Sequence, residues 1–336
     1  MELTEKFAST SRKIEFQFVS CPLCGVDDCQ PAYIRADEGS VVRCGRCGLL
    51  YLNPRPLDAS IVSFYDESYF TNNGHGSAYK DYVSMQGVAL KHREHPGFLA
   101  LHVIERYVAP RGKRLLDIGC AGGHLLHVAR RRGFIVMGVD ISPYAAAQAK
   151  RSFGVDVFAG SLGQADFEGA SFDVVTALEV IEHLIDPVEW LREIHRILKP
   201  GGLVLLSTPN GGCAGKFGER WRGFTTSFEH LTFFDESTLN KALAMVSLES
   251  LGAWTRGNGM DFGLRSSRSF KAVIKKGGKH LLSILPPVLS LVNGWRQTRS
   301  LASSHERPSG HTIWVLARKQ MPFAHAARHV REAPTP

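Results

Sequence analysis

The stretch RLLDIGCAGGHLL, residues 114–126, decides the fold that the sequence predicts. Its apolar LLDI portion predicts a buried strand, its glycines predict a tight turn, and HLL opens a segment compatible with a helix. A strand, a tight turn and a helix in this order bring backbone N–H groups and a helix N-terminus up to a polar ligand. Asp117 lies just before the first glycine, Gly119, at the carboxyl end of the strand. Open α/β sheets bind ligands at that end, so we expect the functional site there.

A second predicted strand, FIVMGVD, ends at Asp140, where a carboxylate is placed to accept hydrogen bonds from a ribose diol. A dinucleotide-binding turn would carry the pattern G-x-G-x-x-G between the two strands. In that register the three positions are Gly119, Ala121 and His124, and a histidine at the third would obstruct close packing of the helix on the strand. The pattern therefore disfavours a dehydrogenase.

The chain beyond Asp140 alternates between strand-like and helix-like segments. Ser142-Pro143 predicts a helix start, with serine at the N-cap and proline at the first helical position. The other predicted elements are helices within 82–108, a strand at 155–162, a strand running into a loop within 171–184, an amphipathic helix at 186–202 that stops at Pro200-Gly201, and strands at 202–210, 246–257 and 310–319. This alternation predicts a parallel sheet with helices on both faces.

The motif Asp117-x-Gly119-x-Ala121-x-Gly123 resembles motif I of the class I S-adenosylmethionine-dependent methyltransferases, with alanine at the usual middle glycine. The later segment LKPGGLVLLSTPN resembles the same family. The resemblance implies an α/β fold with a doubly wound, seven-stranded Rossmann-like sheet. It also implies a methyltransferase domain at 111–320, whose last two strands form a closing antiparallel hairpin.

This resemblance implies S-adenosylmethionine as the cofactor and places its parts on named residues. Asp117, Gly119 and Gly123 would hold the methionine end, Asp140 the ribose, and Ser161 with Leu162 the adenine. The full implied cofactor-binding set is Asp117, Gly119, Cys120, Gly123, Asp140, Ile141, Ser161, Leu162 and Glu179.

Two C-x-x-C-G motifs stand near the N-terminus, with Cys21 and Cys24 in the first and Cys44 and Cys47 in the second. Four thiolates at this spacing can close a tetrahedron around Zn²⁺ without an open position, so we expect a structural metal. The segment between them alternates like a β-hairpin, which predicts a zinc ribbon over residues 1–52. Cys29 is surplus to this set. Acidic residues balance the arginines of the ribbon, so a nucleic-acid partner is not expected.

Four residues after the predicted fourth strand could carry chemistry: Glu179, Glu182, His183 and His230. If the segment is helical, the first three share one face. One hypothesis makes His183 or His230 a general base for a hydroxyl acceptor. A second makes the group a Mg²⁺ or Mn²⁺ site, because E-V-I-E-H resembles the metal site of ubiquinone-biosynthesis O-methyltransferases and of small-RNA 2′-O-methyltransferases. A third gives Glu179 a cofactor contact and the others a structural role.

Residues 53–110 predict a helical connector or lid. The ribbon, an NPRP connector and the YDESYF segment together resemble bacterial zinc-ribbon methyltransferases, and Tyr65, Tyr69 and Phe70 would form a lid or pack in the core. A later group would line the acceptor pocket or fill the core: Glu219, Arg220, Trp221, Arg222, Phe224, Phe228 and Phe233.

The composition is that of a globular protein, with 44% hydrophobic and 21% charged residues. The first residues lack the features of a signal peptide, which predicts a cytoplasmic protein. A basic, apolar insertion is expected at 261–308, and its stretch 265–299 holds eight lysines and arginines and no acid, which equals the formal charge of +8 of the whole chain. That stretch would either contact an anionic membrane and admit a lipid-linked acceptor, or cap the cleft. Residues 321–336 are predicted to be a disordered tail. A small-molecule or carrier-linked acceptor is expected, with a nucleic-acid methyltransferase or a non-catalytic scaffold as alternatives.

Overall fold

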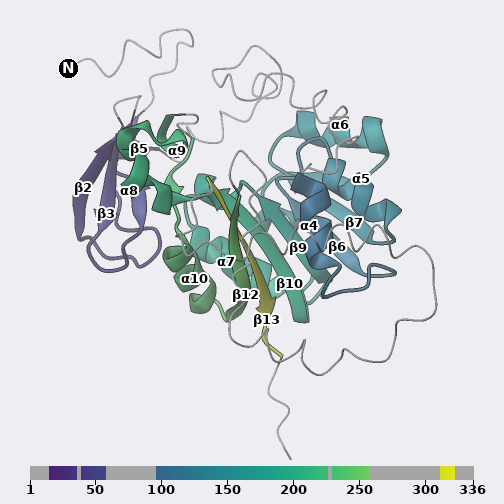
Figure 1. Ribbon diagram of the computed structural model, residues 1–336. Coiled ribbons are helices and arrows are strands. Elements are labelled where there is room, and N and C mark those ends of the chain that lie inside the picture. The colour runs from purple at the N-terminus through teal and green to yellow at the C-terminus, as the bar shows by residue number, and fades with distance from the viewer. Residues whose placement is uncertain (1–14, 36–38, 58–95, 226–228, 257–310, 322–336) are drawn as a thin grey trace, which may run out of the picture.

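The computed structural model describes residues 15–35, 39–57, 96–225, 229–256 and 311–321 (Figure 1). A seven-stranded sheet forms its centre, in the order β12-β13-β10-β9-β6-β7-β8. Its strands are β6 (Arg114–Ile118), β7 (Ile135–Asp140), β8 (Val157–Ala159), β9 (Phe172–Leu178), β10 (Leu198–Pro209), β12 (Leu248–Arg256) and β13 (Thr312–Lys319).

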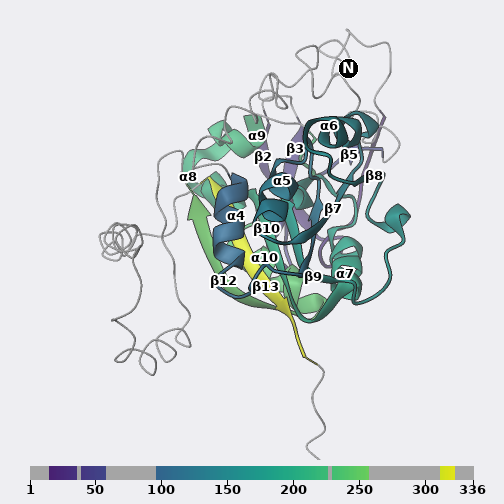
Figure 2. The same cartoon turned by 90° about the vertical axis from the view of Figure 1, so that its right-hand side faces the viewer.

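The five strands from β10 to β8 are mutually parallel. β13 runs antiparallel to both β10 and β12. β12 and β13 lie side by side at one edge of the sheet (Figure 2). The strand order reverses at β6, so the turn after β6 lies at the topological switch point, where ligands bind in this kind of sheet. The doubly wound sheet and the closing hairpin expected from the family resemblance are thus confirmed.

In the described part of the chain, five longer helices flank the sheet: α4 (Pro96–Ile104), α5 (His124–Arg131), α6 (Pro143–Phe153), α7 (Pro187–Ile197) and α10 (Glu236–Met245). Neighbouring residues of one strand separate them into two layers, because successive side chains of a strand point to opposite faces. Leu115 of β6 packs in the apolar cluster that contains residues of α4, α5 and α6. Leu116 packs in the cluster that contains residues of α7 and α10. The sheet is therefore covered on both faces.

Short helical segments complete the described part: α8 (Ala214–Phe217), α9 (Arg222–Thr225) and 3₁₀ turns at Gly163–Ala165, Ile181–His183, Gly211–Cys213 and Gly218–Arg220.

The predicted start of α6 is confirmed. Ser142 is the N-cap, its hydroxyl accepts a hydrogen bond from the Ala145 N–H at 3.4 Å, and Pro143 follows. The predicted end of α7 is wrong: the helix stops at Ile197, and Leu198 already lies in β10. Proline disfavours helical conformation in the residue before it, so Pro200 pushes the preceding backbone into the strand.

The predicted third strand is also shorter than expected, since β8 ends at Ala159. Beyond it the Ser161 N–H donates to Gln164 Oε1 at 2.8 Å, and the Gln164 N–H donates to Ser161 Oγ at 3.3 Å. These reciprocal side-chain bonds fold the chain into a 3₁₀ turn instead of extending the strand.

The N-terminal segment forms the expected hairpin from β2 (Cys29–Ile34) and β3 (Ser40–Cys44). Two further strands join it, β4 (Leu50–Leu52) and β11 (Thr232–Phe233), to give a four-stranded sheet in the order β11-β4-β3-β2. A small two-stranded sheet pairs β1 (Phe16–Gln17) with β5 (Arg55–Pro56). β11 follows β10 of the seven-stranded sheet in the sequence, so the ribbon sheet is built from both parts of the chain. In Figure 1 the purple ribbon strands lie beside α8 and α9.

Several predictions fall outside the described residues. They are the lid aromatics Tyr65, Tyr69 and Phe70, residue Phe228, the basic insertion 265–299 and nearly all of the tail at 321–336. Within the described ranges, no helix combines the length and apolarity that crossing a bilayer requires.

Candidate active site

The turn after β6 has the left-handed backbone that its glycines allow. Gly119 has a φ of 67° and Gly123 a φ of 78°. A Cβ atom at Gly123 would lie 2.8 Å from the Ala149 Cβ, so α5 and α6 approach too closely for a side chain. Ala121 also has a positive φ, 44°, and its methyl group is the departure from the three-glycine motif. The turn therefore accepts alanine at that position at the cost of a strained backbone.

Four N–H groups of this turn already have acceptors within the protein. Those of Gly119 and Cys120 donate to the Val139 carbonyl at 2.8 and 3.3 Å. The Gly123 N–H donates to the Cys120 carbonyl at 2.9 Å, and the Ala121 N–H donates to Asp140 Oδ2 at 2.8 Å. What the turn offers a ligand is therefore its bare glycine surface and the flanking carboxylates, and not these four donors.

Asp140 holds the turn in place at the end of β7. Its Oδ2 accepts from Ala121, and its Oδ1 accepts from the Ser142 N–H at 2.9 Å. The residue is 6% exposed, and this burial raises the pKa of its carboxyl while the two backbone bonds lower it. Each oxygen retains a second lone pair for a ligand hydroxyl.

Asp117 lies at the end of the neighbouring strand and is 4% exposed. Its Oδ1 accepts a hydrogen bond from the Thr176 hydroxyl at 2.7 Å. Burial raises the pKa of Asp117 to about 7, opposed by Thr176 and reinforced by the nearby charge of Asp140. Two buried carboxyls in one place form a site that a cationic ligand would stabilise.

The residues expected around an adenine lie after β7 and β8. Ile141 keeps 39% of its surface exposed, and Phe158 of β8 keeps 37%. Ser161 is exposed, whereas Leu162 is buried at 3%. Exposed apolar surface at this edge suits a flat, apolar ring.

Glu179 follows β9 with a left-handed backbone, at a φ of 57°. Ser207 of β10 holds it on both sides: the Glu179 N–H donates to the Ser207 carbonyl at 2.9 Å, and the Ser207 hydroxyl donates to Glu179 Oε1 at 2.8 Å. Protein surrounds the carboxyl on most sides, and this desolvation raises its pKa, although the residue keeps an exposed face through which a ligand can reach it. The helix condition for a shared face fails, because Glu179 lies outside the Ile181–His183 turn.

Glu182, His183 and His230 do come together. Their ligand atoms all lie within 4.8 Å of one another, and Glu179 is not part of this group. The two imidazole rings meet edge to face with centroids 4.8 Å apart, and His183 Nε2 is 3.9 Å from Glu182 Oε1. His230 lies two residues before β11. The N–H of the next residue, Leu231, donates to the Glu182 carbonyl at 2.8 Å.

Burial determines the electrostatics of this cluster. It lowers the pKa of His183 to about 4 and that of His230 well below the usual range, so both rings are neutral at physiological pH. It raises the pKa of Glu182, and the Glu179 charge adds to the rise. Among the described residues, neither Glu182 oxygen has a normally aligned hydrogen-bond partner; the nearby Thr208 hydroxyl favours the charged form only weakly. Such a buried, unsatisfied carboxyl next to two neutral imidazoles is the donor set of a cation site.

The turn and the cluster are neighbours. A Cβ atom at Gly119 would lie 2.6 Å from Val180 Cγ2, and Val180 stands between Glu179 and the turn that carries Glu182. The candidate cofactor turn and the candidate reactive group therefore share one wall, by which we mean the contact between Gly119 and Val180.

The four predicted zinc ligands also converge. Cys21, Cys24, Cys44 and Cys47 form one group whose sulfur atoms lie within 4.8 Å of one another. Cys29 is not in it, as expected. Burial raises the pKa of the Cys21 and Cys47 thiols, an effect that a bound cation would reverse.

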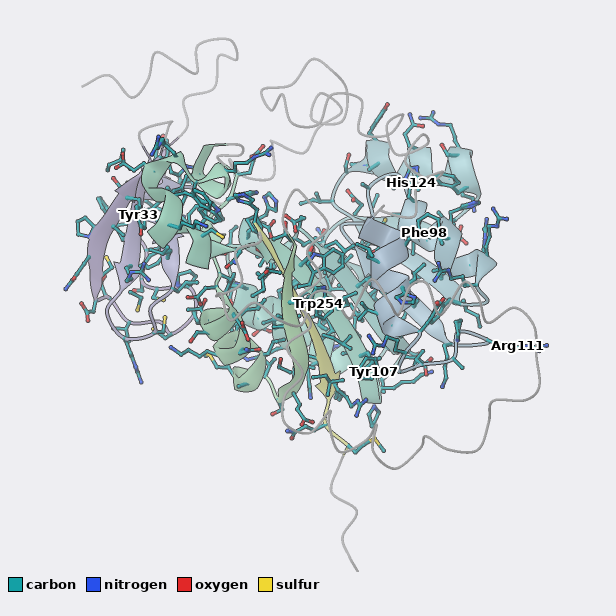
Figure 3. All side chains as sticks on the ribbon, viewed as in Figure 1. Tyr33, Phe98, Tyr107, Arg111, His124 and Trp254 are labelled. Atoms are coloured by element: carbon teal, nitrogen blue, oxygen red, sulfur yellow. The ribbon has the colours of Figure 1, made fainter. Side chains whose placement is uncertain are left out.

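Three aromatics offered as pocket or core residues belong to the core. Trp221, Phe224 and Phe233 are each at most 2% exposed and pack edge to face, with centroids 4.8–5.9 Å apart. The Tyr33 ring of the ribbon packs against the Phe224 ring, with centroids 5.3 Å apart. Figure 3 shows Tyr33 on the ribbon hairpin at the left and His124, at the start of α5, at the right.

Sequence reasoning missed the partners of the acidic residues. Thr176 interrupts the apolar run VVTAL of β9 and Ser207 ends the apolar run LVLL of β10, and those polar positions are the signal that could have found them. Arg35, whose guanidinium donates to the His230 carbonyl at 3.1 Å, had no such signal, because it stands in a polar part of the hairpin.

Known proteins resemble this chain chiefly over its sheet. The family described as "Methyltransferase domain" matches residues 91–249. A ubiquinone biosynthesis O-methyltransferase of Pseudomonas aeruginosa (strain LESB58) is 41% identical over 118 residues, which is 33% of this chain and 51% of that protein. The enzyme of the same name from Ruegeria pomeroyi is 44% identical over 108 residues, 30% of this chain and 42% of that protein.

The chain thus spans about half the length of these curated relatives. Among solved structures, an S-adenosylmethionine-dependent methyltransferase from Thermotoga maritima superposes with a TM-score of 0.47 at 14% identity, covering 71% of this chain and 97% of that one. The family match falls on the same strands that surround the glycine turn and the two aspartates. Residues 91–249 of this chain are therefore an S-adenosylmethionine-dependent methyltransferase domain, and a zinc-ribbon-like cysteine cluster lies before them.

Proposed function

We propose that this protein transfers the methyl group of S-adenosylmethionine to an oxygen atom of a small or carrier-linked acceptor. The observation that carries the proposal is the shared wall between the glycine turn and the Glu182–His183–His230 cluster, formed where Gly119 meets Val180. The names of the curated relatives favour a hydroxyl acceptor of the ubiquinone-precursor kind.

The residues that would hold the cofactor fit its charge. S-adenosylmethionine carries an ammonium group, a sulfonium and a ribose diol, and supplies an activated methyl group when bound. Asp117 would face the methionine end, Asp140 the diol, and Ser161 with Leu162 the adenine, with Ile141 beside them. The nearly buried carboxyl of Asp117 gains a counter-charge from such a ligand and that of Asp140 gains two hydroxyl donors, which suits groups whose pKa burial has raised.

Because the methyl group is already activated, the chain's own task is to align the acceptor and to remove its proton. His183 is neutral and can accept a proton. An imidazole with a pKa of about 4, however, is a weak base for a hydroxyl group.

That weakness favours a second candidate, in which the cluster holds a divalent cation that lowers the acceptor's pKa. The Glu182 oxygens, which have no normally aligned partner in the described residues, and the two neutral imidazoles fit such an ion. The expectation of Mg²⁺ rested on an oxygen-rich set that included Glu179. Two imidazoles and one carboxylate suit Mn²⁺ or Zn²⁺ better than Mg²⁺.

A lipid-linked acceptor reached through the segment 265–299 is a further part of the proposal. Co-sedimentation with liposomes that contain anionic lipid tests it. We expect deletion of 265–299 to abolish co-sedimentation. Liposome binding that survives the deletion would contradict the proposal of a lipid-linked acceptor reached through this segment.

Calorimetry with S-adenosylhomocysteine and with NADH tests the proposed cofactor. We expect binding of the first alone, and its loss when Asp117 and Asp140 are both replaced by alanine in a protein that circular dichroism shows to be folded. NADH binding would overturn the proposal. Transfer of a labelled methyl group into fractionated cell extract then identifies the acceptor class; label in nucleic acid would favour the alternative of a nucleic-acid methyltransferase.

A further inference from the structure

Two buried arginines connect the N-terminal segment to the candidate cluster. Arg35 follows β2 and is 3% exposed; Arg55 lies in β5 and is 7% exposed. The Arg35 guanidinium donates to the His230 carbonyl at 3.1 Å, and the Arg55 guanidinium donates to the Ile185 carbonyl at 3.0 Å. One arginine therefore holds the backbone of a cluster histidine itself, and the other holds the loop two residues beyond His183.

A backbone connection runs between the same two parts of the chain. The Leu52 N–H, at the end of β4, donates to the Leu231 carbonyl at 2.9 Å, and the Leu231 N–H donates to the Glu182 carbonyl at 2.8 Å. β11, which begins at Thr232, is itself a strand of the ribbon sheet, where Thr232 pairs with Tyr51. A strand of the ribbon sheet thus begins two residues after His230.

Buried charge makes these contacts demanding. A guanidinium taken out of water is costly unless its donors are satisfied, and its planar fork accepts little change in direction. The segment that carries Arg35 cannot shift without breaking a bond to His230, and Arg55 sets the same condition on Ile185. The two loops that form the cluster are separate in sequence, and both are held by the N-terminal segment.

We propose that Arg35 and Arg55 are positioning residues of the Glu182–His183–His230 cluster, so that the N-terminal segment, with its zinc ribbon, is a structural wall of the candidate active site. The role of that wall rests on the proposed function, whereas the positioning itself can be measured without an acceptor. Neither arginine touches the turn after β6, so cofactor affinity should not depend on them.

The test uses the full chain with ¹³C-labelled histidine and reads the ring resonances of His183 and His230, assigned from their loss in His183→Gln and His230→Gln. Arg35→Met should shift the ring resonances of His230 and of its ring neighbour His183. Arg55→Met should shift the ring resonances of His183 more than those of His230. Arg43→Met is the matched control. Arg43 is exposed on the same hairpin, and among the described residues its guanidinium donates to the Gly48 carbonyl at 3.2 Å, within the ribbon, so both resonances should stay in place.

Arg35→Lys serves as the conservative variant, which keeps the charge and one donor. Its resonances should fall between those of the wild type and Arg35→Met, or away from the wild type if Arg35→Met does not fold. Wild-type resonances in a folded Arg35→Met or in Arg35→Lys would overturn the proposal, as would equal shifts in Arg43→Met. Zinc content and circular dichroism, measured on each sample, establish that the ribbon is intact.

Calorimetry with S-adenosylhomocysteine on the same samples separates this proposal from the proposed function. Unchanged affinity in Arg35→Met and Arg55→Met is expected. Failure of the wild type to bind the nucleoside would remove the proposed function and leave the histidine resonances to decide the positioning role. A loss of affinity in both arginine variants that matches the resonance shifts would contradict a role confined to the cluster.

Discussion

The Thr176 hydroxyl lies 2.7 Å from Asp117 Oδ1 and is the hydrogen-bond partner that favours the charged form of this buried carboxyl. Thr176→Val keeps the shape of the side chain and removes that donor. We expect the variant to bind S-adenosylhomocysteine more weakly at neutral pH by about 1–2 kcal/mol, or roughly 5- to 30-fold. Calorimetry measures the loss. Thr312→Val, at the start of β13, should bind normally, and equal affinity of the Thr176 variant would contradict the assigned role of Asp117.

Cofactor binding should depend on pH through Asp117. Burial raises the pKa of this carboxyl from 3.8 to about 7, so the folded protein holds the proton more tightly than the unfolded chain. The resulting stability is fully present below about pH 3.8 and is lost as the pH rises through about 7. A cationic ligand favours the carboxylate and must displace the proton below about pH 7. Affinity for S-adenosylmethionine should therefore fall by up to tenfold per pH unit below about 7.

Calorimetry at about pH 6 and about pH 8, in two buffers of different ionisation enthalpy, detects that proton. We expect proton release at the lower pH and none at the higher. A binding enthalpy that is independent of the buffer at both values would show that Asp117 is not the group that meets the positive charge.

Local patterns in the sequence were enough to predict the sheet and its turn. The spacing of Asp117, Gly119 and Gly123 reports a backbone requirement that is met within a few residues, and the same is true of Ser142-Pro143. The two cysteine motifs likewise predicted the converged thiol group. In each case the deciding contacts are short in sequence, so that the pattern carries them.

Contacts between distant segments could not be read in this way. His230 joins Glu182 and His183 from a segment that leads into β11, which pairs with β4, and a strand of two residues has no periodicity to reveal this pairing. The left-handed backbone of Glu179 depends on Ser207 of another strand, and this contact removes Glu179 from the face that a helix would have given it. Arg35 is an ordinary surface residue by its sequence, and its burial appears only when the ribbon packs on the loop of His230.

Gly123→Ala should destabilise the fold. The added Cβ would meet the Ala149 Cβ at 2.8 Å in a left-handed backbone, so both overpacking and a conformational penalty apply. We expect a loss of about 2–4 kcal/mol in the free energy of unfolding, measured by urea denaturation. Gly163→Ala is the control, because no atom lies within 4 Å of its added Cβ, and it should change stability by less than about 1 kcal/mol. Similar losses for both variants would contradict the packing explanation.

The cysteine cluster should contain one zinc ion per chain. Elemental analysis of purified protein should show this ion, and Cys47→Ser should lose most of it, because a tetrahedral structural site needs all four thiolates. Cys29→Ser is the matched control, since Cys29 lies on the same hairpin outside the cluster, and its zinc content should equal that of the wild type. If zinc persists in Cys47→Ser and is lost from Cys29→Ser, the ion is bound by Cys29 and not by Cys47, and the assigned zinc site is wrong.

The cluster of Glu182, His183 and His230 separates metal-assisted transfer from simple base catalysis by its affinity for Mn²⁺. If the cluster binds a cation, titration followed by electron paramagnetic resonance should detect Mn²⁺ binding, and Glu182→Gln should weaken it by at least about tenfold, or 1.4 kcal/mol, because a neutral amide replaces the one carboxylate ligand. Glu189→Gln is the control, since Glu189 is exposed on α7 and paired with Arg192. Binding that Glu182→Gln leaves intact would place the ion elsewhere. Absence of Mn²⁺ binding in a protein that binds S-adenosylhomocysteine would favour His183 as the base, whose burial keeps it neutral and able to accept a proton.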